Sequence, residues 1–423
     1  MPGAGTAAPA LRAEVPPARC LDVSRLISRV GRGPMTGVDR VEFAYLTHLL
    51  ERPEPLFLLS RTALGHVLLD RHGAETLRAL LAGERESWER PDLLATLFRR
   101  LPEPRRRAEA TLRRLAVARA RRGRLGRMLA RHLPPGSVYF NVGHANLTEE
   151  VLAAWQGLPG ARIAVLIHDT IPLDHPEFQR PGTSDRFAAM LARVARRTEL
   201  IICNSAFTET RLRHWLARLA PGASPRSLVA HLGVEPAPPD ASLLPESVRA
   251  AGTYFVCVGT IEPRKNHALL LDVWEALERD LGARHTPPLI LAGSRGWENR
   301  DVFARLDVIA ARGGSVRELP GLADAALSAL IAGSAGLLFP SRAEGFGLPP
   351  AEAAALGARV LCADLPVYRE FLDDYPVYAK PDDMYFWLQT TGRWAADIRA
   401  DRRAGAFRPP RWSEHFRCVL SAI

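Results

Sequence analysis

Short apolar runs alternate with amphipathic segments along most of this 423-residue chain, and that alternation constrains the fold more than any other feature. An apolar run bounded by turn residues is typical of a buried strand, and strands separated by helices form parallel sheets. In the first half of the chain, this pattern predicts a helix over Val38–Leu50. It also predicts strands at Cys20–Ile27, Pro55–Leu59, Ser137–Asn141, Arg162–His168, Leu200–Asn204 and Leu228–Leu232.

The same pattern begins again after residues 236–250, where proline and polar residues predict a linker. Strands are expected at Tyr254–Gly259, Leu289–Ala292 and Gly336–Phe339, and helices at about Ala268–Glu278, Val302–Ala311 and Ala325–Ala332. Because a chain of this length exceeds what one hydrophobic core usually serves, we predict an α/β protein with Rossmann-like domains at residues 19–235 and 251–405. Residues 1–18, rich in alanine, proline and glycine, are expected to form a disordered tail.

The five cysteines are scattered and odd in number, and none has the spacing of a metal site. This pattern indicates a reducing compartment. The amino terminus lacks the basic and apolar regions of a signal peptide, and no apolar run reaches the roughly 18 residues of a membrane span. We therefore expect a cytoplasmic protein.

The net charge of +10 is concentrated between Arg99 and Arg131, where arginines dominate. Apolar residues recur at helical spacing between them, at Leu112, Leu115, Leu125, Met128 and Leu129, and predict a basic amphipathic helix within a helical insertion at about residues 84–133. Such a face suits the anionic inner leaflet of a membrane or a nucleic acid. Packing against the domain, with the arginines in water, is the alternative.

The strongest local signal is S-R-A-E-G-F-G-L-P-P-A-E-A-A-A-L-G at Ser341–Gly357. A strand ends near its start, Gly345 and Gly347 form a flexible turn, and a helix follows. Free amides and the positive helix end at such a turn favour a bound anion. Glu344 and Glu352 flank the turn and would repel a phosphate, so we expect them to accept hydrogen bonds from sugar hydroxyls.

A second signal is G-T-I-E-P-R-K-N-H at Gly259–His267, which also joins a strand to a helix. Arg264 and Lys265 are adjacent there and could neutralise a leaving diphosphate, arginine by a two-pronged contact and lysine as a point charge. No D-x-D occurs in the chain, so the usual carboxylates for a metal on a diphosphate are missing. The two cations are expected to take the metal's role, with no metal or other cofactor required.

Together these segments resemble the signature of the family 4 (group 1) glycosyltransferases, retaining enzymes of GT-B fold. Glu344 and Glu352 match the family's E-x7-E element, and Arg264 and Lys265 match the R-K of its donor loop. The similarity continues through P-G-L at Pro320–Leu322, L-F-P-S before Arg342, and L-P-V-Y-R-E at Leu365–Glu370, and covers most of Tyr254–Ala379.

The first half resembles the family less tightly. Thr36-Gly37-Val38 is similar to its first glycine loop, and H-D-T-I-P-L-D-H-P at His168–Pro176 to its His-Asp segment beside the transferred sugar. Asn204-Ser205 and His231–Val234 match strand ends near the cleft, and Trp412-Ser413 the start of a final helix within 406–423 that crosses back to the first domain. Residues 84–133 match nothing in the family.

The resemblance implies a retaining, metal-independent transferase. It would move a sugar, mannose or a related hexose, from a nucleotide diphosphate to a glycan or lipid-linked glycan during bacterial surface polysaccharide synthesis. The catalytic candidates are His168, Arg264, Lys265 and Glu344, and His144 is a further candidate on the acceptor side. The donor-binding candidates are Gly37, Gly259, Leu322, Gly345, Phe346, Gly347, Leu348 and Glu352.

Two alternatives accompany this hypothesis. A nucleotide-sugar epimerase of the same fold would need no acceptor, but the E-x7-E match does not favour it. A nucleic-acid-binding protein would use the face at Arg99–Arg131, which has Phe98 but few aromatic residues for stacking on bases. The expected partners are thus a nucleotide sugar, a glycan acceptor and, through the basic face, the anionic inner leaflet, with no nucleic acid.

Overall fold

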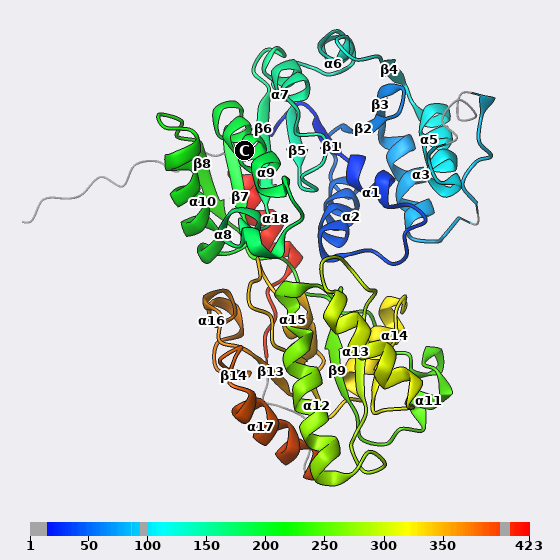
Figure 1. The fold of residues 1–423 in the computed structure, drawn as a ribbon. Coiled ribbons are helices and arrows are strands. Elements are labelled where there is room, and N and C mark those ends of the chain that lie inside the picture. Colours follow the sequence, from blue (N-terminus) through cyan, green and yellow to red (C-terminus); the bar gives the residue numbers. More distant parts are fainter. Residues whose placement is uncertain (1–14, 86, 94–99, 398–406) are drawn as a thin grey trace, which may run out of the picture.

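The computed structural model describes residues 15–85, 87–93, 100–397 and 407–423, which form two α/β domains, one above the other in Figure 1. The first contains an eight-stranded sheet of order β4-β3-β2-β1-β5-β6-β7-β8, and the second a six-stranded sheet of order β11-β10-β9-β12-β13-β14. The predicted α/β class is confirmed. Within these described ranges, no helix is both long and apolar enough to cross a bilayer.

In the first sheet, β3 pairs antiparallel with β2 and β4, and the remaining neighbours are parallel. Its strands are β1 (Arg19–Asp22), β2 (Leu56–Thr62), β3 (Gly65–Leu69), β4 (Ala118–Ala120), β5 (Val138–Asn141), β6 (Arg162–Ile167), β7 (Leu200–Cys203) and β8 (Arg226–Val229). Its helices are α1 (Ser24–Arg29), α2 (Gly37–Leu50), α3 (Arg71–Leu81), α5 (Glu103–Leu115), α6 (Leu125–His132), α7 (Glu149–Gln156), α8 (Ile171–Asp174), α9 (Thr183–Arg197) and α10 (Ala206–Leu219). Strands β1, β5 and β7 are buried along their whole length, which explains their continuous apolar runs.

The second sheet is parallel throughout. Its strands are β9 (Phe255–Val258), β10 (Leu289–Ala292), β11 (Val316–Glu318), β12 (Gly336–Phe339), β13 (Val360–Ala363) and β14 (Val377–Ala379). The helices after β8 are α11 (Glu246–Arg249), α12 (His267–Leu281), α13 (Arg300–Ala311), α14 (Asp324–Ala332), α15 (Leu348–Ala355), α16 (Pro366–Leu372), α17 (Met384–Ala396) and α18 (Trp412–Ser421). The predicted bounds of β10 and β12 are confirmed without change.

One expected strand is wrong in its second half. The strand predicted at Cys20–Ile27 ends at Asp22, and helix α1 begins at Ser24. The Asp22 carboxylate accepts a hydrogen bond from the Ser24 amide at 2.9 Å, which turns the chain out of the sheet. Leu26 and Ile27 are buried, as expected, but on a helix. The strand predicted at Leu228–Leu232 begins and ends earlier, at Arg226–Val229.

The expected single basic helix within residues 84–133 is also wrong. The described part of this segment forms α5 and α6 with the edge strand β4 between them. Leu112 joins a hydrophobic cluster that includes residues of both domains, and Leu115 packs beside it. Leu125, Met128 and Leu129 join a second cluster within the first domain. The apolar side chains that suggested a membrane-facing helix are therefore covered by the protein itself.

The end of the chain returns to the first domain, where α18 lies in red among the green and blue helices of Figure 1. The Phe416 ring stacks on His48 of α2 with centroids 3.9 Å apart. The Tyr45 hydroxyl and His415 Nε2 are 2.8 Å apart. Gly233 lies against Trp412 so closely that any Cβ at that position would overlap its ring. Helix α18 thus packs against α2 and Gly233 of the first domain.

We predict that Phe416→Ala destabilises the protein, because its side chain is 2% exposed, stacks on His48 and Trp412, and meets Tyr45 edge-on. The expected loss is about 3–5 kcal/mol of unfolding free energy, typical of a buried aromatic truncated to alanine. Thermal and urea unfolding followed by circular dichroism measure it. Arg417→Ala, on the exposed side of the same helix, is the control, and equal stability of the two variants would contradict the packing described.

Candidate active site

The loop after β9 presents the predicted cations at the carboxyl end of the second sheet. Gly259 has φ of 132°, a conformation that other residues rarely adopt. A short 3-10 turn, η3 (Pro263–Lys265), then leads through Asn266, in the left-handed region at φ 56°, into α12. These two unusual backbone positions place Arg264 and Lys265 against the sheet instead of in solvent.

Both cations bind the same carboxylate. Lys265 Nζ lies 2.5 Å and Arg264 Nη1 2.8 Å from Oε1 of Glu344. Arg264 Nε also pairs with Glu262 at 2.6 Å, and Lys265 Nζ lies 4.4 Å from the centre of the Phe339 ring. The side chains of Lys265 and Glu344 are each 9% exposed, so this ion cluster is mostly shielded from water.

The pKa values follow from burial and pairing. Burial alone would raise the pKa of Glu344, but the charges of Arg264 and Lys265 outweigh it and lower that pKa to about 2. Burial lowers the pKa of Lys265, with Glu344 opposing the shift. Burial raises the pKa of Glu262 against the pull of both cations. Glu344 is therefore firmly ionised at neutral pH.

The predicted glycine turn lies directly against the first domain. A Cβ on Gly345 would overlap the carbonyl oxygen of His168, so only glycine fits there. The Gly345 carbonyl accepts a hydrogen bond from Thr208 Oγ1 at 3.2 Å. Gly347 has φ of 99°, and α15 begins at the next residue, Leu348, with its first amides at the turn. Phe346 between the glycines is buried.

His168 sits across from that turn, directly after β6. Its Nε2 lies 2.7 Å from the Val142 carbonyl, which can only accept, so this nitrogen carries the proton. Burial lowers the pKa of His168 to about 4 and the ring is neutral at pH 7, leaving Nδ1 as an acceptor. His144, at φ 57°, lies beside it with ring centroids 5.0 Å apart, and burial lowers its pKa to about 3.

The glycine loop of the first domain, at Gly37, lies against the donor turn of the second domain at Leu348. A Cβ on Gly37, the first residue of α2, would lie 3.3 Å from Leu348 Cδ1, so the amino ends of α2 and α15 are neighbours. One turn further, Arg40 Nη1 pairs with Glu352 Oε1 at 2.5 Å. Burial raises the pKa of Glu352, and Arg40 opposes this.

A second contact between the domains involves Glu370 of α16. Its carboxylate accepts hydrogen bonds from the backbone amides of Ala206 and Phe207 at 2.6 and 3.2 Å, which are the first amides of α10. It also lies 2.7 Å from His231 Nε2. A carboxylate at a helix amino end is favourable, so Glu370 helps to hold the two domains together.

The structure brings most predicted residues together. Arg264, Lys265 and Glu344 form one cluster, and the pairs Gly345 and His168, and Gly37 and Leu348, face each other across the domains. Leu322 and Glu352 take no part in the contacts of this cluster.

Leu322 packs half-buried against the main core, and Glu352 is engaged by Arg40 beside a small cavity also lined by Ala237, Asp324 and Ser328. Their roles in donor binding stay predictions.

Sequence reasoning missed Glu262, Arg40 and Glu370 as site residues. Glu262 and Glu370 both stand inside the quoted motifs, but their roles depend on three-dimensional contacts. Arg40 lies one turn after Gly37, and that spacing is its only local signal. Among the described residues, no three histidine, cysteine, aspartate or glutamate side chains gather as a metal site would require.

Comparisons with known proteins bear on the family and the fold. Residues 246–383 match the family model described as glycosyl transferases group 1. The serotype-specific mannosyltransferase WbdA of Escherichia coli is 31% identical over 233 residues, which are 52% of this chain and 28% of WbdA. The O-antigen chain mannosyltransferase B of Escherichia coli is 38% identical over 131 residues, 31% of this chain and 34% of that protein. The chain therefore spans about a quarter to a third of the length of these relatives.

The crystal structure of Anabaena HepE in complex with UDP-glucose has a TM-score of 0.57 to this chain at 15% identity. The match covers 96% of this chain and 97% of HepE. That likeness establishes the fold, and the predicted GT-B arrangement of two Rossmann-like domains is confirmed. The match of residues 246–383 to the group 1 model confirms the resemblance found in the sequence.

The low pKa of Glu344 predicts a specific loss of stability in acid. Because the native pKa of about 2 lies below the ordinary 4.5, the folded protein holds fewer protons than the unfolded chain between these values. The stabilisation, about 3 kcal/mol, is complete above pH 4.5 and is lost as the pH falls toward 2. We expect Glu344→Gln to be less stable at pH 6 and to lose less further stability on acidification.

Melting temperatures of both proteins between pH 6 and 2.5 measure this difference. Glu51→Gln, a surface carboxylate on the first domain, is the control and should follow the wild type. Parallel curves for the wild type and Glu344→Gln would show that Glu344 is not held ionised by the cations.

Proposed function

We propose that this chain is a retaining, metal-independent glycosyltransferase. It moves a hexose, mannose or a close relative, from a nucleotide diphosphate to a glycan or lipid-linked glycan of a bacterial surface polysaccharide. The observation that carries the proposal is the buried cluster of Arg264, Lys265 and Glu344 at the carboxyl end of the second sheet, facing His168 across the glycine turn. Open α/β sheets bind their ligands at this edge.

Arg264, Lys265 and the first amides of α15 would hold the diphosphate. Lysine is well suited as a point charge at this position, and it is a rare residue here: Lys265 and Lys380 are the only lysines in the chain. The amino end of α2, which lies against α15 through Gly37, would add a second positive helix end from the first domain. Phosphate groups bind readily at such converging helix ends.

Glu344 and His168 would hold the sugar. Glu344 uses Oε1 for both cations, and Oε2 takes no part in those pairs, so Oε2 can accept a hydrogen bond from a sugar hydroxyl. His168 offers its unprotonated Nδ1 for the same purpose, since Nε2 donates to Val142. At neutral pH, with a pKa of about 4, His168 is an acceptor and not a general acid.

Transfer with retention then needs little acid–base chemistry from the protein. The acceptor hydroxyl attacks the anomeric carbon from the face that the diphosphate leaves, so one carbon–oxygen bond forms as the other breaks. The hydroxyl proton passes to the departing phosphate oxygen. The protein contributes position and charge stabilisation, which are large contributions in enzymes generally.

The proposed donors and acceptor are supported by the named relatives, two mannosyltransferases, of which one is an O-antigen chain enzyme. Incubation of the purified protein with guanosine-, uridine- and adenosine-diphosphate hexoses, with and without EDTA, tests the proposal. Slow release of nucleoside diphosphate that EDTA does not reduce is expected. Interconversion of the sugars would instead indicate an epimerase, and no reaction with any donor would reject both enzymes.

We predict that Lys265→Ala lowers this turnover by about a hundredfold or more, as removal of one preorganised charge partner does in other enzymes. Lys380→Ala, at the exposed second lysine, is the matched control and should retain wild-type turnover. Turnover of both variants is measured under saturating donor, and circular dichroism checks their folds. Near-normal turnover of Lys265→Ala would refute the assignment of Lys265 to the diphosphate.

A further inference from the structure

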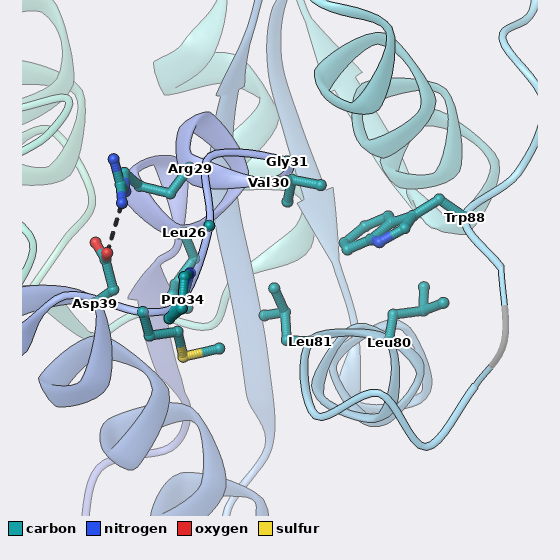
Figure 2. Close-up of a pocket in the computed structure, with 11 residues that line it drawn as sticks. Leu26, Arg29, Val30, Gly31, Pro34, Asp39, Leu80, Leu81 and Trp88 are labelled. Atoms are coloured by element: carbon teal, nitrogen blue, oxygen red, sulfur yellow. Dashed lines mark hydrogen bonds and ion pairs between the residues drawn. The ribbon is translucent and has the colours of Figure 1, made fainter. Parts of the chain in front are cut away.

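A cavity of about 270 Å³ lies entirely in the first domain and plays no part in the donor site above. Its size is close to the lower end of the roughly 300–1,000 Å³ typical of small-molecule sites, which suits one sugar ring. Figure 2 shows Trp88 on one side, above Leu80 and Leu81 of α3, with the pair of Arg29 and Asp39 on the opposite side.

The cavity reaches the glycine loop of the first domain, which contacts the proposed donor turn. Met35 and Asp39 line it, and they flank Gly37, whose backbone lies against Leu348 of the donor turn. Gly37 and its neighbours at the start of α2 thus lie between the cavity lining and the donor turn. This location suits a molecule that must meet the donor sugar.

The segment that matched nothing in the family builds one wall of the cavity. Trp88 belongs to it, and the Trp88 carbonyl accepts a hydrogen bond from Arg107 Nη2 of α5 at 2.7 Å. The next amide, of Glu89, donates to Thr111 Oγ1 at 3.0 Å. On the other wall, Gly31 packs so tightly on Pro104 of α5 that a Cβ would overlap it.

The lining combines two kinds of surface. Trp88, Leu80, Leu81 and Val30 offer apolar contact, and the half-buried indole ring can cover the C–H face of a sugar. Opposite, Asp39 is 1% exposed and holds both Arg25 and Arg29, with Nε–carboxylate distances of 2.7 and 3.2 Å. The Arg29 side chain is 28% exposed, so its guanidinium retains donors for hydroxyls.

We infer that this cavity binds a sugar residue of the acceptor glycan, with Trp88 as its stacking platform and Arg29 as its polar contact. The inference rests on the proposed transferase function and gives the segment at residues 84–133 a role: Arg107 holds Trp88 in place, and Trp88 selects the acceptor. A free apolar chain is a poorer occupant, because it would leave the polar groups of Arg29 and the glycine loop without partners.

Saturation-transfer NMR tests the inference without knowledge of the acceptor. The probes are the methyl α-glycosides of mannose, glucose, galactose, rhamnose and N-acetylglucosamine, together with farnesyl phosphate as an apolar, anionic alternative. At least one glycoside should bind, and Trp88→Ala should weaken it about tenfold, with Trp88→Phe between the two. Val117→Ala, at an exposed apolar residue of the same segment, is the control and should bind like the wild type.

Three outcomes would overturn the inference: no glycoside binds, glycoside binding is equal in Trp88→Ala and the wild type, or farnesyl phosphate alone shows the dependence on Trp88. Melting temperatures of the variants show whether they fold. Where the wild type also transfers sugar to a bound glycoside, Trp88→Ala should raise the acceptor KM about tenfold with a far smaller change in the donor KM. A protein that binds glycosides at Trp88 but consumes no nucleotide sugar would refute the proposed function and leave the cavity assignment standing.

Discussion

The shared binding of Arg264 and Lys265 by one carboxylate, Glu344, is the interaction on which the rest of the site depends. Isolated buried charges are costly, so two adjacent cations at the edge of a sheet need nearby acids. Glu262 and Glu344 supply them, and the cluster is close to neutral without a donor. A diphosphate adds negative charge, and the account therefore requires the amino ends of α15 and α2 as well as the two side chains.

The glycines matter because they allow two domains to approach closely at that cluster. Gly345 has no room for a side chain beside His168, and Gly37 brings α2 next to Leu348. These contacts bring groups from both domains close to one another. Glu370 adds a polar link at the amino end of α10. The contact between the two domains thus depends on the shape of the backbone as much as on charge.

Much of this could be predicted from the sequence, and the failures have physical causes. The predicted bounds of β10 and β12 match the structure because turn residues stand on both sides of their apolar runs. Arg264, Lys265 and Glu344 could be predicted because they lie in local motifs. Leu26 was placed on a strand because a short buried run does not distinguish strand from helix. Leu112 and Leu115 recur at helical spacing within α5, and Leu125, Met128 and Leu129 within α6. That pattern did not reveal the short strand β4 between the two helices. The pair of Arg40 and Glu352, and the position of Trp88, arise only from packing between distant segments.

The most direct test of the central claim is a crystal structure of the protein with its best-binding nucleotide sugar, grown in the presence of EDTA. The account predicts pyrophosphate oxygens within hydrogen-bonding distance of Arg264, Lys265 and the first amides of α15. It also predicts that the sugar lies between Glu344 and His168. A diphosphate bound away from both cations, or a donor that enters the site only when a divalent metal replaces EDTA, would contradict it.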